Sequence, residues 1–95
     1  MSERDQYIEK IKAKLDQWNA DIEKMKAKVD EAEADTKIEY QQQLDEMRAQ
    51  RDAAEAELKK IAETGDDAWD DIKGGFDKAW DKISGAFDSA VSRFK

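Results

Sequence analysis

The sequence contains no cysteine, no histidine and no proline. The absence of cysteine and the absence of histidine each exclude a class of structure or chemistry. Without cysteine there is no disulfide framework, no zinc–thiolate site and no thiol nucleophile. Without histidine the chain lacks the commonest general base and the commonest metal ligand. We therefore expect no catalytic residues, no bound metal and no cofactor, and we predict that the protein is not an enzyme.

Glycine and long apolar runs are also scarce. All four glycines lie at or after position 65. No apolar run approaches the roughly 20 residues that are needed to cross a bilayer. The polar start, Met-Ser-Glu-Arg-Asp-Gln, is not typical of a signal peptide. We expect a cytoplasmic protein, with peripheral attachment to a membrane as the alternative.

Positive charge is in short supply, with 17 Lys and Arg against 24 Asp and Glu and a net charge of -7. This balance disfavours nucleic acid as a partner, because phosphates require a basic surface. The sequence also lacks a phosphate-binding loop and a nucleophile elbow, so we expect no small-molecule substrate. With 43% charged residues and a mean hydropathy of -1.03, a disordered chain has to be considered. The regular spacing of apolar residues and the abundance of good helix formers instead predict helices.

The most regular apolar pattern lies near the C-terminus, where large apolar residues recur at spacings of three and four. The pattern is an eleven-residue repeat, Ala-Trp-Asp-Asp-Ile-Lys-Gly-Gly-Phe-Asp-Lys followed by Ala-Trp-Asp-Lys-Ile-Ser-Gly-Ala-Phe-Asp-Ser. Eleven residues make almost three helical turns, so the stripe runs nearly straight along one face of a helix. The predicted interaction face consists of Trp69, Ile72, Phe76, Trp80, Ile83, Phe87, Val91 and Phe94.

This face has two interpretations. It packs on the rest of the chain or on a second copy, or it lies on a lipid surface or in the groove of another protein. Aspartates border it, and the segment carries seven Asp against five Lys and Arg, which disfavours strongly anionic membranes. Neutral membranes stay open as an alternative. Four of the aspartates could hold a divalent cation weakly, but acid at a helix start is the simpler explanation: Asp66, Asp67, Asp70 and Asp71.

Residues 3–32 and 37–63 show heptad repeats, in two registers that are one residue out of step. The narrow apolar seam is typical of a coiled coil. In the first segment the seam consists of Ile8, Ile11, Leu15, Trp18, Ile22, Met25, Val29 and Ala32. In the second it consists of Lys37, Tyr40, Leu44, Met47, Arg51, Ala54, Leu58 and Ile61.

The two heptad segments form either an antiparallel hairpin or one helix of about 60 residues that assembles as a coiled-coil oligomer. No glycine or proline marks a turn between them, which favours the long helix, whereas Thr36 and Glu39 fit a capping box, which favours a new helix start. In a parallel dimer Arg51 would face its own copy at a buried position, and that costs stability. In a hairpin Arg51 would meet Trp18 and could stack on its indole. We therefore predict the hairpin.

The clearest break is Glu63-Thr64-Gly65-Asp66-Asp67, where Gly65 could end a helix in the left-handed conformation. Residues 1–64 are then a coiled-coil hairpin and residues 65–95 an amphipathic helix, from about Asp66 to Phe94. The predicted fold is all-α and similar to a three-helix bundle. Three glycines inside the last helix predict that it is poorly formed when isolated.

Several stretches resemble a family of short bacterial coiled-coil proteins, usually described as hypothetical or stress-response proteins. They are Leu-Asp-Gln-Trp-Asn-Ala at 15–20, Glu-Ala-Glu-Ala-Asp at 31–35, Ile-Glu-Tyr at 38–40, Asp-Ala-Trp-Asp-Asp-Ile-Lys at 67–73, Ala-Trp at 79–80 and Ser-Arg-Phe-Lys at 92–95. The resemblance implies a bacterial protein linked to stress, without site residues to transfer. The expected function is non-enzymatic: the C-terminal apolar face self-associates or binds a helical partner, or alternatively a lipid surface.

Overall fold

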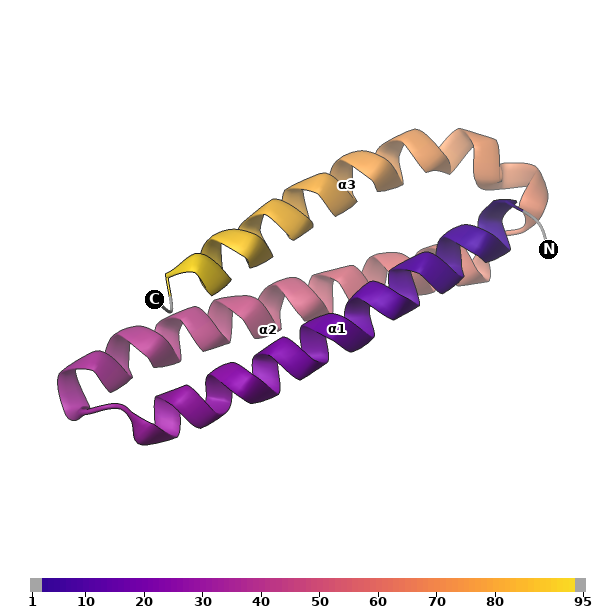
Figure 1. Ribbon diagram of the computed structural model, residues 1–95. Coiled ribbons are helices and arrows are strands. Elements are labelled where there is room, and N and C mark those ends of the chain that lie inside the picture. Colours follow the sequence, from indigo (N-terminus) through magenta and orange to yellow (C-terminus); the bar gives the residue numbers. More distant parts are fainter. Residues whose placement is uncertain (1–2, 94–95) are drawn as a thin grey trace.

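The computed structural model describes residues 3–93, which form three long α-helices joined by two short connections (Figure 1). Helix α1 spans Glu3–Glu31, α2 spans Ala34–Glu63 and α3 spans Asp66–Ser92. The chain reverses at each connection, so α1 and α3 run parallel to each other and α2 runs antiparallel to both (Figure 1). The all-α, three-helix fold predicted from the sequence is confirmed, and Phe94 lies outside the described residues.

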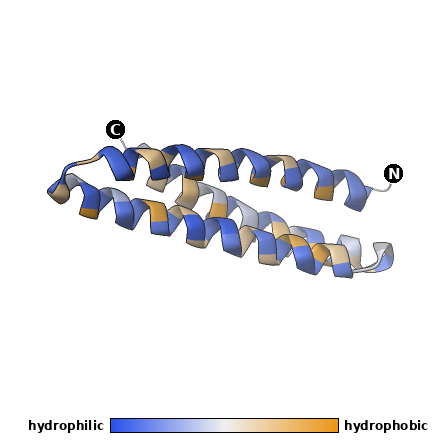
Figure 2. Ribbon diagram, turned by 90° about the horizontal axis from the view of Figure 1, so that it is seen from below, coloured by the Kyte–Doolittle hydropathy of each residue, from blue (hydrophilic) through white to orange (hydrophobic). Residues whose placement is uncertain are grey.

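The core follows the heptad seams of the first two helices. Hydrophilic residues dominate each helix, and apolar residues are interspersed at regular intervals (Figure 2). Because apolar residues at heptad spacing share one helix face, each helix can bury a narrow stripe and leave its charges in water. The buried residues of α1 and α2 all belong to the predicted seams: Ile11, Leu15, Trp18, Ile22, Met25, Val29, Leu44, Met47, Ala54 and Ile61.

The first connection consists of Ala32 and Glu33, so the alternative of one continuous helix is wrong. The predicted capping box is also wrong, because α2 begins at Ala34 and Thr36 lies inside its first turn. Glu33 is the residue that precedes the helix, with φ −71° and ψ 160°, and no side chain caps the helix start. Nothing in this turn has a positive φ. The turn is therefore made by residues that are themselves good helix formers.

The second connection, Thr64 and Gly65, has local bonds that end α2. The Thr64 hydroxyl donates to the carbonyl of Lys60 at 2.7 Å, and the Thr64 N–H donates to the carbonyl of Ile61 at 3.0 Å. Gly65 has φ −73° and ψ 160°, so the prediction of a left-handed cap at this glycine is wrong. The Arg4 guanidinium from α1 also donates to the carbonyl of Thr64. This end of the molecule is held by three helices at once.

Helix α2 lies in close backbone contact with both of its neighbours, whereas α1 and α3 meet mainly through their side chains. A small residue at the middle of α2, the fully buried Ala54, lets the backbones approach. The space between α1 and α3 is instead filled by large aromatic rings. The C-terminal apolar face therefore packs inside the chain.

Candidate interaction surface

The apolar face of α3 is directed at the other two helices. Trp69 is 3% exposed, Phe76 4% and Phe87 1%. Ile72, Trp80, Ile83 and Val91 are partly buried and pack against the same core. Ala90, on the border of the stripe, is buried as well. Seven of the eight residues of the predicted face thus lie together, and Phe94 lies outside the described residues.

At the start of α3, the face packs on Tyr7 of α1. The Tyr7 ring lies 5.2 Å from the Trp69 ring, tilted by 60°, and 5.4 Å from the Phe76 ring, edge to face. Such tilted pairs are favourable, because the positive edge of one ring meets the negative face of another. The Tyr7 hydroxyl donates a hydrogen bond to the Asp77 carboxylate on α3. Tyr7 thus joins the two parallel helices by both an apolar and a polar contact.

Near the middle of α3, the face packs on Trp18 of α1. The Trp18 ring is nearly parallel to those of Trp80 and Phe87, with centroid distances of 5.1 and 4.1 Å. Trp80 and Phe87 are seven residues apart, which corresponds to about 10.5 Å along a helix. This length is close to the sum of the two centroid distances from Trp18. This geometry places the Trp18 indole between the two rings. Three aromatic rings are stacked in this contact.

Both faces of Trp18 are therefore occupied by rings, and Arg51 does not stack on it as predicted. The Arg51 guanidinium instead donates to Asn19 Oδ1 at 3.2 Å and to Asp52 Oδ1 at 3.0 and 3.2 Å. Asn19 is one position from Trp18, so Arg51 lies near the part of α1 that the hairpin prediction placed opposite it. The rings of α3 take the place at the indole that was predicted for Arg51.

Polar residues beside the apolar face, one of them acidic, attach α3 to α1. The Lys73 ammonium pairs with the Glu3 carboxylate, and this contact lowers the pKa of Glu3 below its usual value, by hydrogen bonding first and by charge attraction second. Trp69 adds a weaker contribution in the same direction, and desolvation opposes it. With the bond from Tyr7 to Asp77, two polar contacts tie the first turns of α1 to the first half of α3.

The three glycines of α3 make no packing contact that requires glycine. A Cβ atom added at Gly74, Gly75 or Gly85 would meet nothing within 4 Å, and all three residues are exposed with negative φ. In a helix interior glycine costs about 0.5–1 kcal/mol relative to alanine, because its backbone is freer when unfolded. Helix α3 is therefore held in the bundle by its rings and not by its own helical preference.

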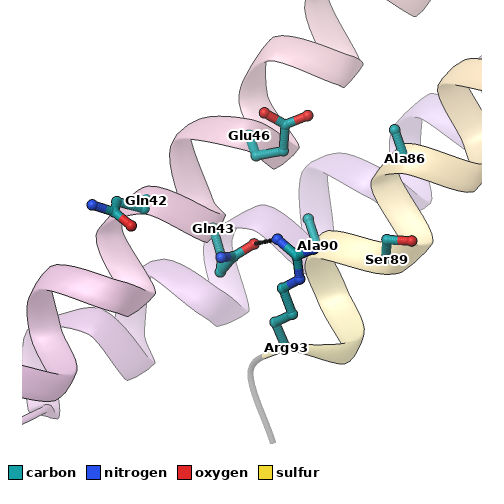
Figure 3. A pocket seen from close by; sticks show the side chains of 7 residues that line it. All are labelled: Gln42, Gln43, Glu46, Ala86, Ser89, Ala90 and Arg93. Atoms are coloured by element: carbon teal, nitrogen blue, oxygen red, sulfur yellow. Dashed lines mark hydrogen bonds between the residues drawn. The ribbon is translucent and has the colours of Figure 1, made fainter.

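The grooves of the described surface are shallow and offer little chemistry. One of about 400 Å³ lies between α2 and the end of α3, where Arg93 donates to Gln43 Oε1 at 3.5 Å (Figure 3). Its lining consists of Gln42, Gln43, Glu46, Ala86, Ser89, Ala90 and Arg93. Its charged lining residues are one carboxylate, Glu46, and one guanidinium, Arg93. Among the side chains that the structure describes, which do not include that of Asp66, no group of three acidic residues is arranged to hold a metal ion.

Sequence reasoning missed two residues of this surface. Tyr7 lies beside the heptad seam and acquires its role only from Trp69, Phe76 and Asp77 on another helix. Ile38 is the one large apolar residue that stands exposed in the described chain, at 63%, near the first turn. Ile38 interrupts the polar run at the start of α2, which is the signal that could have found it.

Comparison with known proteins adds no family. No protein-family model matches the chain, and neither a curated protein nor a solved structure matches it. Along the described residues, each helix is too polar or too short to pass through a membrane. The function must therefore be argued from the aromatic face and from what holds it in place.

Proposed function

We propose that this chain is a non-enzymatic helical interaction protein in which α3 is the exchangeable element. In the closed bundle α3 lays its aromatic face on α1 and α2. In the bound form the same face lies on an apolar stripe of another helical protein. The observation that carries the proposal is the mismatch in α3: nearly complete burial of Trp69, Phe76 and Phe87 on a helix that three exposed glycines weaken.

Release of α3 is supported by how it is attached. Its contact with α1 includes ring stacking and the Tyr7–Asp77 and Glu3–Lys73 pairs, without close backbone approach, whereas its backbone lies as close to α2 as that of α1 does. Such contacts can be replaced by any apolar surface of similar width, because the hydrophobic effect is not directional. The absence of histidine and cysteine and the net charge of -7 support a role without catalysis and without nucleic acid. A stress-related role in bacteria rests on the family resemblance alone.

A tether between α1 and α3 tests the proposal. The chain has no cysteine, so Glu3→Cys with Lys73→Cys provides the only two thiols, at positions whose side chains meet in the closed bundle. A short, cleavable bis-maleimide bridge between them should hold α3 in place. The matched control carries Lys59→Cys and Glu63→Cys, two exposed positions one turn apart on α2, so its bridge leaves α3 free.

The readout is photo-crosslinking in cells that express the chain, with a photoreactive residue at Phe87 and, for reference, at Ile38. We expect the untethered and control proteins to form crosslinks to other proteins from position 87, and the tethered protein to form none until its bridge is cleaved. Crosslinks that persist with the tether intact would refute release of α3. Vesicles of neutral phosphatidylcholine serve as the second arm: a tether-sensitive blue shift of tryptophan fluorescence there, without protein crosslinks, would make lipid the partner.

A further inference from the structure

The two connections of the bundle differ in the contacts that stabilise them. The second has the Thr64 hydroxyl bond, the backbone bond to Ile61, a glycine, and the contact from Arg4. The first has Ala32 and Glu33, no side-chain cap on the helix that follows, and no residue with a special backbone angle. If the second connection became helical, the side-chain contacts of Thr64 and Arg4 would be lost. In the described chain, the first connection has no such side-chain contact to lose.

Joining α1 to α2 through this turn would gain backbone hydrogen bonds. The first four N–H groups and the last four C=O groups of any helix lack partners within it. In a continuous helix, the N–H groups of residues 33–36 would bond to the carbonyls of residues 29–32. The local sequence, Glu-Ala-Glu-Ala-Asp at 31–35, is rich in helix formers. Glu33 has to move from ψ 160° to the helical region.

In a chain straightened at the first turn, the seams of α1 and α2 no longer cover each other. The surface that fits each of them is the matching seam of a second copy. We propose that two copies of this chain exchange α1 across the turn at Ala32 and Glu33 and form an antiparallel, domain-swapped dimer. Helix α1 of one protomer then packs on α2 and α3 of its partner with every contact of the closed bundle preserved, including Trp18 between Trp80 and Phe87. Exchange of an identical element is a low-cost route to a dimer, because only the hinge changes.

The swapped dimer has a shape that a side-by-side dimer does not share. Residues 3–63 would form one helix of about 90 Å at 1.5 Å per residue, against a length of 52 Å for the closed bundle. This proposal goes beyond the exchange of α3, which stays covered in both forms. Each proposal can therefore fail without the other.

Ala34→Pro is the decisive variant. Ala34 is the first residue of α2 and is exposed, and the extended backbone of Glu33 suits a residue before proline. The closed hairpin therefore accepts proline at this position. A continuous helix does not, because proline removes a backbone hydrogen bond and clashes with the preceding turn, so dimerisation should weaken by roughly a hundredfold or more. Ile38→Lys is the matched control, since it breaks any dimer that forms through the exposed Ile38 and spares the hinge.

The full chain is refolded at about millimolar concentration, and its mass and maximum dimension are measured by sedimentation and by solution X-ray scattering. We expect a dimer roughly twice as long as the closed bundle for the natural sequence and for Ile38→Lys, and a monomer for Ala34→Pro. Deletion of Glu33 shortens the turn and brings the two heptad registers into step, so it should favour the dimer at least tenfold. A chain that stays monomeric, a dimer near 52 Å long, or a dimer that survives Ala34→Pro would each overturn the proposal.

Discussion

The hairpin of α1 and α2 and the single helix α3 are stabilised in different ways. The hairpin has no glycine, and its buried heptad seam is mainly aliphatic. Helix α3 has three glycines and an eleven-residue repeat, and it meets α1 through rings. Heptads favour a left-handed supercoil and eleven-residue repeats do not, so the apolar stripe of α3 runs straighter along its helix than the seams of the hairpin. Large rings can fill the space between two such stripes, and the helix that they hold is the one for which we propose release.

The largest effect should come from removing Trp18, a residue of the hairpin seam that also packs on α3. Trp18 is 5% exposed and lies between two rings of α3, while its seam position faces α2. Trp18→Ala should cost about 3–5 kcal/mol of unfolding free energy, because a cavity opens in the widest part of the core. A domain of this size has about 5–14 kcal/mol in total. Urea unfolding followed by circular dichroism measures the loss, and a cost below that of Trp80→Ala would contradict the central place of Trp18.

The seams of the hairpin could be predicted because heptad spacing is a local property of the sequence. Every buried residue of α1 and α2 lies at a predicted seam position. The position of the first turn could not be predicted, because Ala32 and Glu33 carry no turn signal and the chain reverses only because the seams gain more by pairing. Tyr7 and the true neighbours of Arg51 depend on α3, so no pattern within one helix could reveal them.

The aromatic face was predicted residue by residue, yet its partner was not. An apolar stripe has the same spacing whether it covers a hairpin, a second copy or a lipid surface. The structure decides that the rings of α3 pack inside the chain in the closed form. The sequence could not reveal this, because the packing of the rings depends on the distances between helices. The spacing of apolar residues within one helix carries no information about those distances.

The second prediction separates the two regions. Phe87 is 1% exposed and belongs to α3, whereas Val29 is 3% exposed and lies close to the first turn. Phe87→Ala should cost about 3 kcal/mol or more. If α3 opens on its own, hydrogen exchange should accelerate in α3 amides well beyond the change in α1 and α2. Val29→Ala should accelerate exchange in the hairpin without that preference for α3. Uniform acceleration by Phe87→Ala would mean that the bundle opens as one unit.

The third prediction tests the glycines. Because a Cβ atom meets nothing within 4 Å at these positions, Gly74→Ala, Gly75→Ala and Gly85→Ala should each stabilise the chain by about 0.5–1 kcal/mol. Ala13→Gly, at an exposed position in the middle of α1, should destabilise it by a similar amount. Thermal unfolding of the triple alanine variant measures the combined gain. A loss of stability would show that the α3 glycines have a structural role after all.

The smallest effect concerns the Glu3–Lys73 pair, which joins α1 to α3 and is partly exposed to water. Lys73 lowers the folded-state pKa of Glu3, so this pair stabilises the closed bundle above the unfolded-state pKa, and the contribution disappears as the pH falls through the folded-state value. Salt should weaken it, as for any exposed pair. In Lys73→Gln, the pKa of Glu3 measured by carboxyl NMR should rise toward its ordinary value, and the thermal midpoint should change little. An unchanged pKa would show that the pair does not persist in solution, and the bond from Tyr7 to Asp77 would then be the described polar contact that still joins α1 to α3.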